Sequence, residues 1–322
     1  MPVLLGKRRG LTQCATVTGQ FVVLALDHRQ NLRRELRPDA PGQVAYAEMV
    51  DFKLAVVRAV GPGASGLLLD PEIGVGPAIA DGALPGDTGL IVAVEATGYE
   101  GSPEARTSRI LPGWSVEAAK RIGASAVKLL VYYHPDAPTA AAQERLVADV
   151  AAACRGLDIA LFLEPLSYGL DGGRLAGEAR RRVVIETARR LMSSGADVLK
   201  AEFPYDASVT DRGQWADACA ELDAATPLPW VLLSGGVDDT TFEAQVAAAC
   251  DAGASGALAG RSVWAEAATL AEPERTANLV SAGRARLARL AAIIGERGRP
   301  WAPRWDAAIR PDRPGEGWYV DR

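Results

Sequence analysis

The chain has 322 residues, of which 48% are hydrophobic and 23% are charged, and its formal net charge at pH 7 is -5. This composition is typical of a globular protein with a substantial core, and it excludes an intrinsically disordered chain. The acidic balance gives no electrostatic basis for binding nucleic acid or an anionic membrane surface, so the expected partner is a small molecule.

The sequence contains no pattern of a secretion signal or a membrane anchor. The opening MPVLLGKRRG reaches its basic cluster too early to hold the apolar core of about 7 to 15 residues that a signal peptide needs. No later run approaches the roughly 20 apolar residues of a transmembrane helix. We therefore expect a cytoplasmic protein.

Cysteine and histidine are too sparse and scattered for a metal site. The chain has four cysteines, far apart and without a CxxC pair, and only two histidines. This pattern argues against a zinc site and a redox dithiol, and the cysteines are interpreted as reduced, mostly buried side chains. The chemistry is therefore expected to need no metal and no other cofactor.

Eight short apolar runs recur along the chain, and most are followed by a stretch with helical periodicity. Continuous apolar runs are typical of strands buried on both faces, as in a parallel sheet covered by helices. Strands are predicted at 21–26, 66–70, 90–95, 126–133, 159–164, 197–202, 230–234 and 256–260. Helices are predicted at 43–60, 115–122, 139–155, 178–194, 211–224 and 240–252, with a long closing helix at 262–292.

This order of elements predicts an α/β fold, namely a single-domain (β/α)8 TIM barrel with a C-terminal extension. Such a barrel takes roughly 250 residues, which leaves room for extensions in this chain. Gly residues at the helix ends, as in RIGAS, SSGAD and DAGAS, fit the passage from each helix to the next strand. A doubly wound open sheet is the alternative, although no GxGxxG element follows the first strand.

Two long connections follow predicted strands. Residues 71–89 are rich in Gly and Pro, with at most a short helix, and residues 96–113 form a longer loop. Because both follow strands, both are expected at the C-terminal mouth, where barrel enzymes build their active sites.

The barrel domain is predicted to span 1–292, and residues 293–322 form an extension rich in Arg, Pro and Trp. This segment is too short for a core of its own. Its tryptophans, Trp301, Trp305 and Trp318, indicate packing on the barrel or at a subunit interface. A homo-oligomer is expected as well.

Charged residues interrupt or end several predicted strands. Lys128 lies in the fourth strand and Lys200 in the sixth, whereas Glu164 ends the fifth and Asp27 closes the first. If both lysines point inward, they surround the Glu164 carboxylate. A lysine amine attacks a carbonyl only when neutral, and burial with a second cation nearby would disfavour its charged form. The alternative is that both lysines simply reach solvent at the strand ends.

A phosphate site is predicted at the last two strands. The seventh strand leads into Ser234, Gly235 and Gly236, and the eighth into Gly260 and Arg261. Loops after strands seven and eight often bind phosphate in barrels, because Gly lets backbone N–H groups approach and Arg adds a fork of donors.

Further candidates lie near the same mouth. His28 and Arg29 follow Asp27 and are expected to bind the far end of a substrate, with a loop-stabilising role as the alternative for His28. Asp70 is interpreted as a brace for its loop. Other possible substrate contacts are Gln30, Glu95, Glu100, Tyr132, Tyr133 and His134.

Several motifs, taken together and in order, resemble one known family. They are ALDHRQ, LLLDPEIG, VKLLVYY, FLEPLSY, GADVLKAEFP, PWVLLSGGVDDTTF and GASGALAGRSVW. The chain resembles the class I tagatose-1,6-bisphosphate aldolases and their sulfofructosephosphate aldolase relatives, over nearly the whole barrel. The resemblance implies a Schiff-base aldolase that cleaves a phosphorylated ketose to dihydroxyacetone phosphate and a three-carbon aldehyde.

The resemblance also implies roles for residues that match its motifs. Lys200 would be the Schiff-base lysine, Glu164 the proton-transfer acid/base, Lys128 the second active-site lysine, and Asp27 a catalytic or substrate-orienting carboxylate. His28 stands where these families typically have Gln, which leaves the aldehyde side of the substrate open.

By the same resemblance, the phosphate of the dihydroxyacetone phosphate moiety would be held by Ser234, Gly236, Gly260 and Arg261. The last motif is more similar to the sulfosugar branch, and LLLDPEIG and FLEPLSY to the tagatose branch. The branch therefore stays open.

Three other functions fit the same barrel. A phosphosugar isomerase or epimerase would need no imine, and a phosphosugar sensor would keep the pocket without turnover. A zinc-dependent class II aldolase is disfavoured because two histidines hardly supply its ligands.

Overall fold

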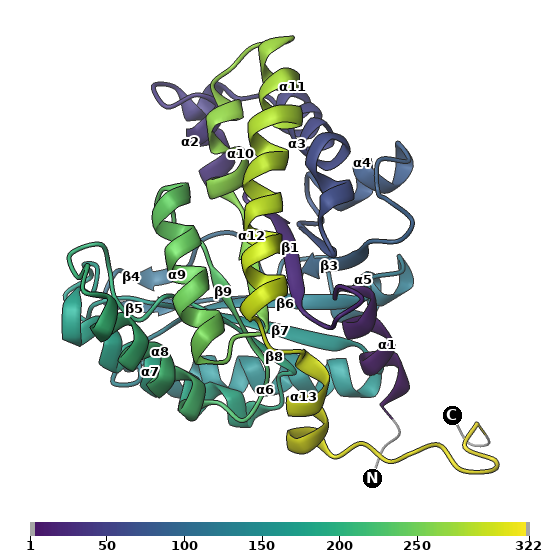
Figure 1. Cartoon of the computed structure of the whole chain (residues 1–322), viewed down its shortest axis with the longest axis vertical. Coiled ribbons are helices and arrows are strands. Elements are labelled where there is room, and N and C mark those ends of the chain that lie inside the picture. The colour runs from purple at the N-terminus through teal and green to yellow at the C-terminus, as the bar shows by residue number, and fades with distance from the viewer. Residues whose placement is uncertain (1–3, 320–322) are drawn as a thin grey trace.

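A computed structural model describes residues 4–319 of the chain. Within them, eight parallel strands close a barrel in the order β1, β2, β3, β6, β7, β8, β9 and β10 (Figure 1). The strands are β1 (Phe21–Leu26), β2 (Gly66–Leu69), β3 (Gly89–Ala93), β6 (Ala126–Tyr133), β7 (Ala160–Ser167), β8 (Val198–Ala201), β9 (Trp230–Leu233) and β10 (Gly256–Ala259). The predicted TIM barrel is confirmed, and the closed sheet rules out the open alternative.

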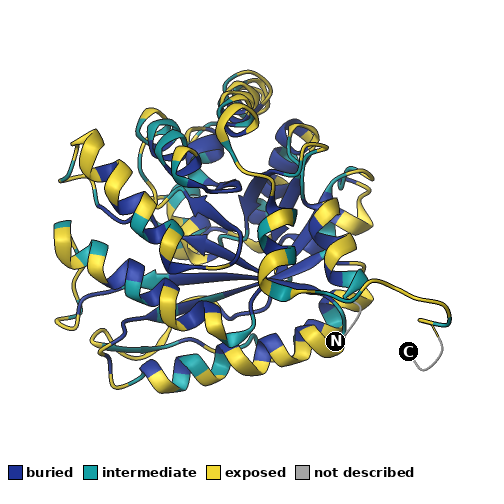
Figure 2. Cartoon of the chain, turned by 60° about the horizontal axis from the view of Figure 1, so that its bottom comes forward, coloured by how far each residue is buried: buried dark blue, intermediate teal, exposed yellow. Residues whose placement is uncertain are grey.

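Helices surround this barrel and leave their polar faces to solvent. In Figure 2 the strands are buried, while the outer sides of the helices are exposed. The helices are α1 (Leu5–Gln13), α2 (Gln30–Leu36), α3 (Tyr46–Val60), α4 (Val75–Ala80), α5 (Val116–Arg121), α6 (Ala140–Gly156), α7 (Gly177–Leu191), α8 (Arg212–Ala225), α9 (Asp239–Ala252), α10 (Arg261–Ala268), α11 (Glu274–Asn278), α12 (Arg284–Arg297) and α13 (Trp301–Ile309). None of the helices in the described residues is long and apolar enough to span a membrane.

The predicted helix at 262–292 is wrong as a single element. The structure divides it into α10, α11, a π-helical turn at Leu279–Gly283 and α12. Pro273 explains the first break, because proline has no N–H for a helix interior and its ring clashes with the preceding turn. It stands immediately before α11, the position at which a helix tolerates it.

The connection after β3 has more structure than a loop. Within the predicted loop 96–113, β4 (Glu100–Ser102) pairs antiparallel with β5 (Ala105–Thr107) to form a hairpin. Gly101 has a φ of +85°, and a side chain there would lie 2.4 Å from the carbonyl oxygen of Ala105. Glycine at this position therefore lets the two short strands approach.

The first part of the C-terminal extension packs on the barrel. Trp301 and Trp305 are buried, and the indole N–H of Trp305 donates to Oδ1 of Asp197 over 3.0 Å. Trp318 differs, because 43% of it is exposed. A subunit interface and a homo-oligomer stay predictions.

Candidate active site

A cavity of about 840 Å3 opens at the C-terminal ends of the barrel strands, and all four predicted catalytic residues line it. Asp27 follows β1, Lys128 lies on β6, Glu164 on β7 and Lys200 on β8. Leu163 pairs with Leu199 in the register of β7 and β8, so Glu164 and Lys200 follow at the same level of neighbouring strands. The structure thus brings together charges that are far apart in the sequence.

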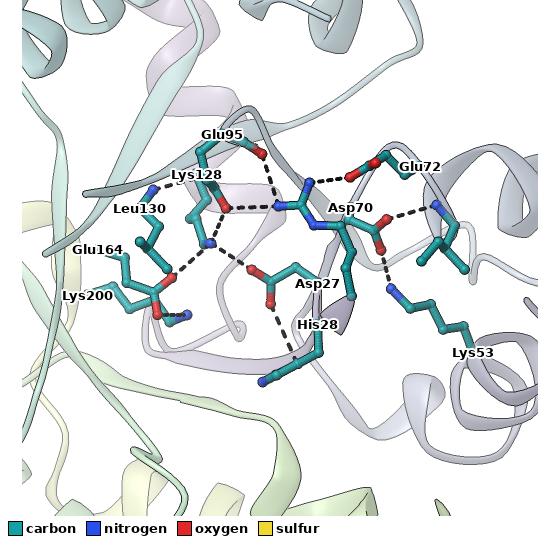
Figure 3. Close-up of polar contacts among 12 residues, drawn as sticks. Asp27, His28, Lys53, Asp70, Glu72, Glu95, Lys128, Leu130, Glu164 and Lys200 are labelled. Carbon is teal, nitrogen blue, oxygen red and sulfur yellow. Dashed lines mark hydrogen bonds and ion pairs between the residues drawn. The ribbon is translucent and has the colours of Figure 1, made fainter. Parts of the chain in front are cut away.

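Lys128 is surrounded by three carboxylates. Its Nζ lies 2.7 Å from Oδ2 of Asp27, 2.6 Å from Oε1 of Glu95 and 2.9 Å from Oε2 of Glu164 (Figure 3). Burial disfavours the ammonium, but the carboxylates outweigh burial and raise the pKa of Lys128 well above its ordinary value. Lys128 is therefore a fixed positive charge rather than a source of free amine.

Lys200 pairs with one carboxylate only among the described residues. Its Nζ lies 2.7 Å from Oε1 of Glu164, so Glu164 presents one oxygen to each lysine. Burial raises the pKa of Glu164, but Lys128 and Lys200 outweigh burial and hold that pKa below its ordinary value. Glu164 is therefore an ionised carboxylate within reach of the Lys200 protons.

Asp27 completes the cluster around Lys128. Burial would raise the pKa of Asp27, but Lys128 and Lys200 outweigh burial and lower it below the ordinary value of a carboxyl group. Three carboxylates, those of Asp27, Glu95 and Glu164, and two lysines therefore meet in one cluster, with Glu164 in contact with both lysines.

Glu95, which the sequence suggests only as a possible substrate contact, belongs to this cluster. Besides contacting Lys128, it accepts a hydrogen bond from the backbone N–H of Leu130 through Oε2 over 3.1 Å. The signal was present in the sequence, because Glu95 ends the predicted third strand as Glu164 ends the predicted fifth.

Arg29 is buried behind Glu95. It donates to Oε2 of Glu72 over 2.6 Å and to the backbone carbonyl of Glu95 over 2.9 Å. These contacts position Glu95 against Lys128. The predicted contact of Arg29 with the far end of a substrate stays a prediction.

A second buried ion pair lies beside the cluster. Lys53 contacts Oδ1 of Asp70, and the other oxygen of Asp70 accepts from the N–H of Ile73 over 2.8 Å (Figure 3). Asp70 thus braces the loop after β2, as its position before Pro71 indicates.

His28 packs between the cluster and the last strand. Its ring meets Trp264 edge to face, with centroids 5.1 Å apart, and Nδ1 lies 3.9 Å from Oδ1 of Asp27. Burial and the nearby cations, chiefly Arg261, lower the pKa of His28 to about 4, although Asp27 opposes them. His28 is therefore neutral at pH 7.

The predicted phosphate residues gather on the side of the mouth formed by β9 and β10. A side chain at Gly236 would lie 2.7 Å from Nη2 of Arg261, and one at Gly260 would lie 3.0 Å from Cε1 of His28. The φ of +83° at Gly236 favours glycine, and the close approach of His28 leaves little room for a side chain at Gly260. Ser234, Gly235, Gly260 and Arg261 line the cavity, whereas Gly236 backs Arg261.

Arg261 retains donors for an anion. Its Nη1 lies 3.5 Å from Oε1 of Glu35, a loose contact, and its buried Nε has no hydrogen-bond partner. A buried donor without a partner is costly in a folded protein, and a bound anion would satisfy it.

Residues 21–266 match the DeoC/LacD family of aldolases. The chain belongs to this family. It is 33% identical over 279 residues to tagatose 1,6-diphosphate aldolase 2 of Streptococcus agalactiae serotype III (strain NEM316), with 80% of this chain and 85% of the relative covered. It is 34% identical over 280 residues to the tagatose 1,6-diphosphate aldolase of Lactococcus lactis subsp. lactis, with the same coverage. The protein is accordingly an aldolase, a carbon-carbon lyase.

Solved structures share the fold of this aldolase. An archaeal fructose 1,6-bisphosphate aldolase has a TM-score of 0.60 at 21% identity, with 88% of this chain and 97% of that one covered. The fructose-bisphosphate aldolase of Plasmodium falciparum has a TM-score of 0.68 at 15% identity, with 92% and 96% covered.

No group of three or more metal-ligating side chains occurs in the described part of the aldolase. Four arginines at the cavity, which the sequence analysis does not single out, join the predicted residues there: Arg34, Arg106, Arg174 and Arg180. They lie outside the barrel strands, so no strand pattern marks them, and only their shared position at the mouth reveals them.

Proposed function

We propose that this aldolase works through a Schiff base on Lys200 and cleaves a phosphorylated ketose to dihydroxyacetone phosphate and a three-carbon aldehyde. One observation carries the proposal: Glu164 lies between two buried lysines, and Lys200 has one carboxylate partner where Lys128 has three. Lys128 keeps its proton among three carboxylates, so we assign Lys200, whose one carboxylate partner is Glu164, as the nucleophile.

The first half of the reaction forms the imine. Lys200 gives a proton to Glu164, and its free amine attacks the ketone carbon to form a carbinolamine. Glu164 then returns the proton to the carbinolamine hydroxyl, which leaves as water. The distance of 2.7 Å between Nζ of Lys200 and Oε1 of Glu164 suits both transfers.

The second half breaks the carbon-carbon bond. Glu164 removes the proton of the C4 hydroxyl, the bond between C3 and C4 breaks, and its electron pair moves into the iminium to give an enamine. The aldehyde leaves. The enamine then takes a proton at C3, and water hydrolyses the imine to release dihydroxyacetone phosphate and free Lys200.

Lys128 and Asp27 support these steps without taking part in the covalent chemistry. Because Lys128 keeps its proton, it favours the ionised form of Glu164 after each transfer. Asp27 touches Lys128 and lines the cavity, where it can accept a hydrogen bond from a substrate hydroxyl.

The phosphate next to the ketone would lie at Ser234, Gly235, Gly260 and Arg261, with Gly236 supporting Arg261. Glycine-rich backbone and an arginine fork are the groups that bind phosphate in such loops. The names of the relatives favour tagatose 1,6-bisphosphate as the ketose. A 6-deoxy-6-sulfofructose 1-phosphate is the second candidate, because the motif GASGALAGRSVW is more similar to the sulfosugar branch.

Borohydride trapping tests the proposal. Incubation with dihydroxyacetone phosphate and sodium borohydride is expected to add the reduced triose phosphate to the peptide that contains Lys200, detectable by mass spectrometry. Lys200→Met abolishes the adduct, whereas Lys120→Met, a change at an exposed lysine, keeps it. Loss of cleavage on adding a chelator, or an adduct on another lysine, would overturn it.

The same variants test the alternative of an isomerase or epimerase. Such an enzyme would interconvert ketose phosphates without a trappable imine, and Lys200→Ala would keep its activity. Aldehyde release measured with a coupled reductase separates the two reactions.

A further inference from the structure

The rim of the cavity is rich in arginine, although the chain as a whole is acidic. Besides the buried Arg29, five arginines line it, which we call the rim arginines: Arg34, Arg106, Arg174, Arg180 and Arg261. Two of them face carboxylates, since Arg180 lies 3.0 Å from Glu202 and Arg261 lies 3.5 Å from Glu35. Among the described residues, Arg34, Arg106 and Arg174 have no carboxylate at ion-pair distance, and Arg34 donates to Oδ1 of Asn31. Their charges are available to a ligand.

Arg106 is fixed in place by backbone carbonyls. It lies on β5 of the hairpin after β3, and its Nε donates to the carbonyl of Pro103 over 2.9 Å. Its Nη2 donates to the carbonyl of Gly172, in the loop after β7, over 3.0 Å. Arg174 follows Gly172 by two residues, so the same contact brings both arginines to one part of the rim.

Three tyrosine rings surround the Arg106 guanidinium. Its central carbon lies 4.7 Å from the ring centroids of Tyr99 and Tyr168 and 5.7 Å from that of Tyr132. Aromatic faces attract a cation without neutralising it. Among the described residues Nη1 of Arg106 has no hydrogen-bond partner, and the two carbonyl contacts orient the guanidinium before any ligand arrives.

The position of Arg106 faces the proposed phosphate site. In the barrel β3, which leads to the hairpin, is four strands from β9, which leads to Ser234 and Gly235. Lys128 and Lys200 lie on strands between them. A ketose with its first phosphate at β9 and β10 would therefore extend its far end across the lysines toward Arg106.

We propose that Arg106, with Arg174 beside it, binds a tetrahedral oxyanion, phosphate or sulfonate, at the far end of the ketose. These two arginines then determine specificity for the aldehyde half of the substrate. The inference rests on the proposed function. It assigns the far anion to the β4–β5 hairpin rather than to Arg29, whose donors contact Glu72 and Glu95.

The reverse reaction, in which the enzyme condenses an aldehyde with dihydroxyacetone phosphate, allows the aldehyde half of the substrate to be varied by itself. Glyceraldehyde 3-phosphate and glyceraldehyde differ only in the far anion. Arg106→Gln is expected to lower kcat/KM for the phosphorylated aldehyde about tenfold to a hundredfold, the usual effect of losing hydrogen bonds to a charged group. It leaves kcat/KM for glyceraldehyde, and borohydride trapping on Lys200, unchanged.

Further variants sharpen the test. Arg106→Lys gives an intermediate loss, because lysine keeps the charge but not the fork. Arg174→Gln, which leaves the tyrosines and the hairpin intact, gives a smaller loss with the same selectivity. A three-carbon aldehyde with a terminal sulfonate is run in parallel. The wild-type ratio of kcat/KM for the two anionic aldehydes tells which oxyanion the site prefers.

Arg212→Gln is the matched control. Arg212 also lies over an aromatic ring, 4.0 Å from the centroid of Trp215 on α8, but it does not line the cavity. Arg212→Gln should leave kcat/KM unchanged for both glyceraldehyde 3-phosphate and glyceraldehyde. Equal losses for both aldehydes in Arg106→Gln and Arg174→Gln, or no loss for either, would overturn the inference. Failure of the wild type to form the Lys200 adduct would instead overturn the proposed function.

Discussion

Both ends of the barrel bury a lysine against a carboxylate, but the surroundings differ. At the N-terminal end, Nζ of Lys7 lies 2.7 Å from Oδ2 of Asp197. That oxygen also accepts from the N–H of Leu161, and the other oxygen accepts from Trp305. At the mouth, beside a cavity of about 840 Å3, Lys128 contacts three carboxylates, and one of them, Glu164, also contacts Lys200.

Under the proposed mechanism the first pair is structural and the second is reactive. Asp197 contacts a single lysine, and its two oxygens also accept from a backbone N–H and an indole N–H. Glu164 has two lysines, and its Oε2 accepts no hydrogen bond beyond the ion pair with Lys128. A buried lysine alone therefore does not distinguish the two ends. The cavity and the carboxylate that Lys200 shares with Lys128 are the features on which its proposed catalytic role rests.

The largest expected difference between the two ends comes from replacing one lysine at each, Lys200 at the mouth and Lys7 at the N-terminal end. Lys200→Met is expected to lower kcat for ketose cleavage by about 10⁴-fold or more, the scale seen when a covalent nucleophile is removed. Lys7→Met is expected to leave kcat of the folded enzyme unchanged and to lower its free energy of unfolding. Steady-state kinetics and urea unfolding of both variants check this. Comparable kcat losses in both would erase the distinction.

The next effect concerns the shared carboxylate. Glu164→Gln is expected to lower kcat about 10² to 10⁴-fold, because general acid–base catalysis contributes on that scale. Glu202 directly follows the neighbouring strand β8 and also lines the cavity, but it pairs with Arg180, so Glu202→Gln should lower kcat far less. Measuring kcat for cleavage of the same ketose bisphosphate by Glu164→Gln and Glu202→Gln gives the comparison. Similar losses would assign the proton transfer elsewhere.

A third prediction tests the N-terminal end by itself. Asp197→Asn leaves Lys7 buried without a carboxylate and is expected to lower the free energy of unfolding by about 3 to 5 kcal/mol. Asp306→Asn removes an exposed pair with Arg8 between α1 and α13, and should cost no more than about 1 kcal/mol. Urea denaturation gives both values. Reduced kcat in folded Asp197→Asn would contradict the structural role.

Much of the barrel follows from sequence, because buried strands must be apolar. The same rule makes Lys128 and Glu164 visible, since charges are rare in such runs. Pro273 was equally visible as a helix breaker, and the single closing helix was predicted against that signal. These parts depend on residues close together in the chain.

The remaining features depend on contacts between distant segments. Arg106 meets Tyr168 and Gly172 only when the loops after β3 and β7 come together. The engagement of Arg29 with Glu72 and Glu95 likewise needs three strand ends in one place. No periodicity encodes such contacts.

The smallest expected effect is on the pH dependence of the unfolding free energy, and it tests whether the surroundings of His28 keep it neutral. Its pKa is lowered from 6.5 to about 4 in the folded protein, so unfolding lets it take up a proton at mildly acidic pH. The stability that His28 contributes is therefore fully present above pH 6.5 and is lost as the pH falls toward about 4.

His28→Gln, which cannot titrate, should flatten the decline in unfolding free energy across this window. His134, whose pKa is also lowered by burial, keeps part of the slope in both proteins. Urea unfolding at pH 8, 6 and 5 measures the difference between wild type and His28→Gln, and parallel declines would show that His28 is not held neutral by its surroundings.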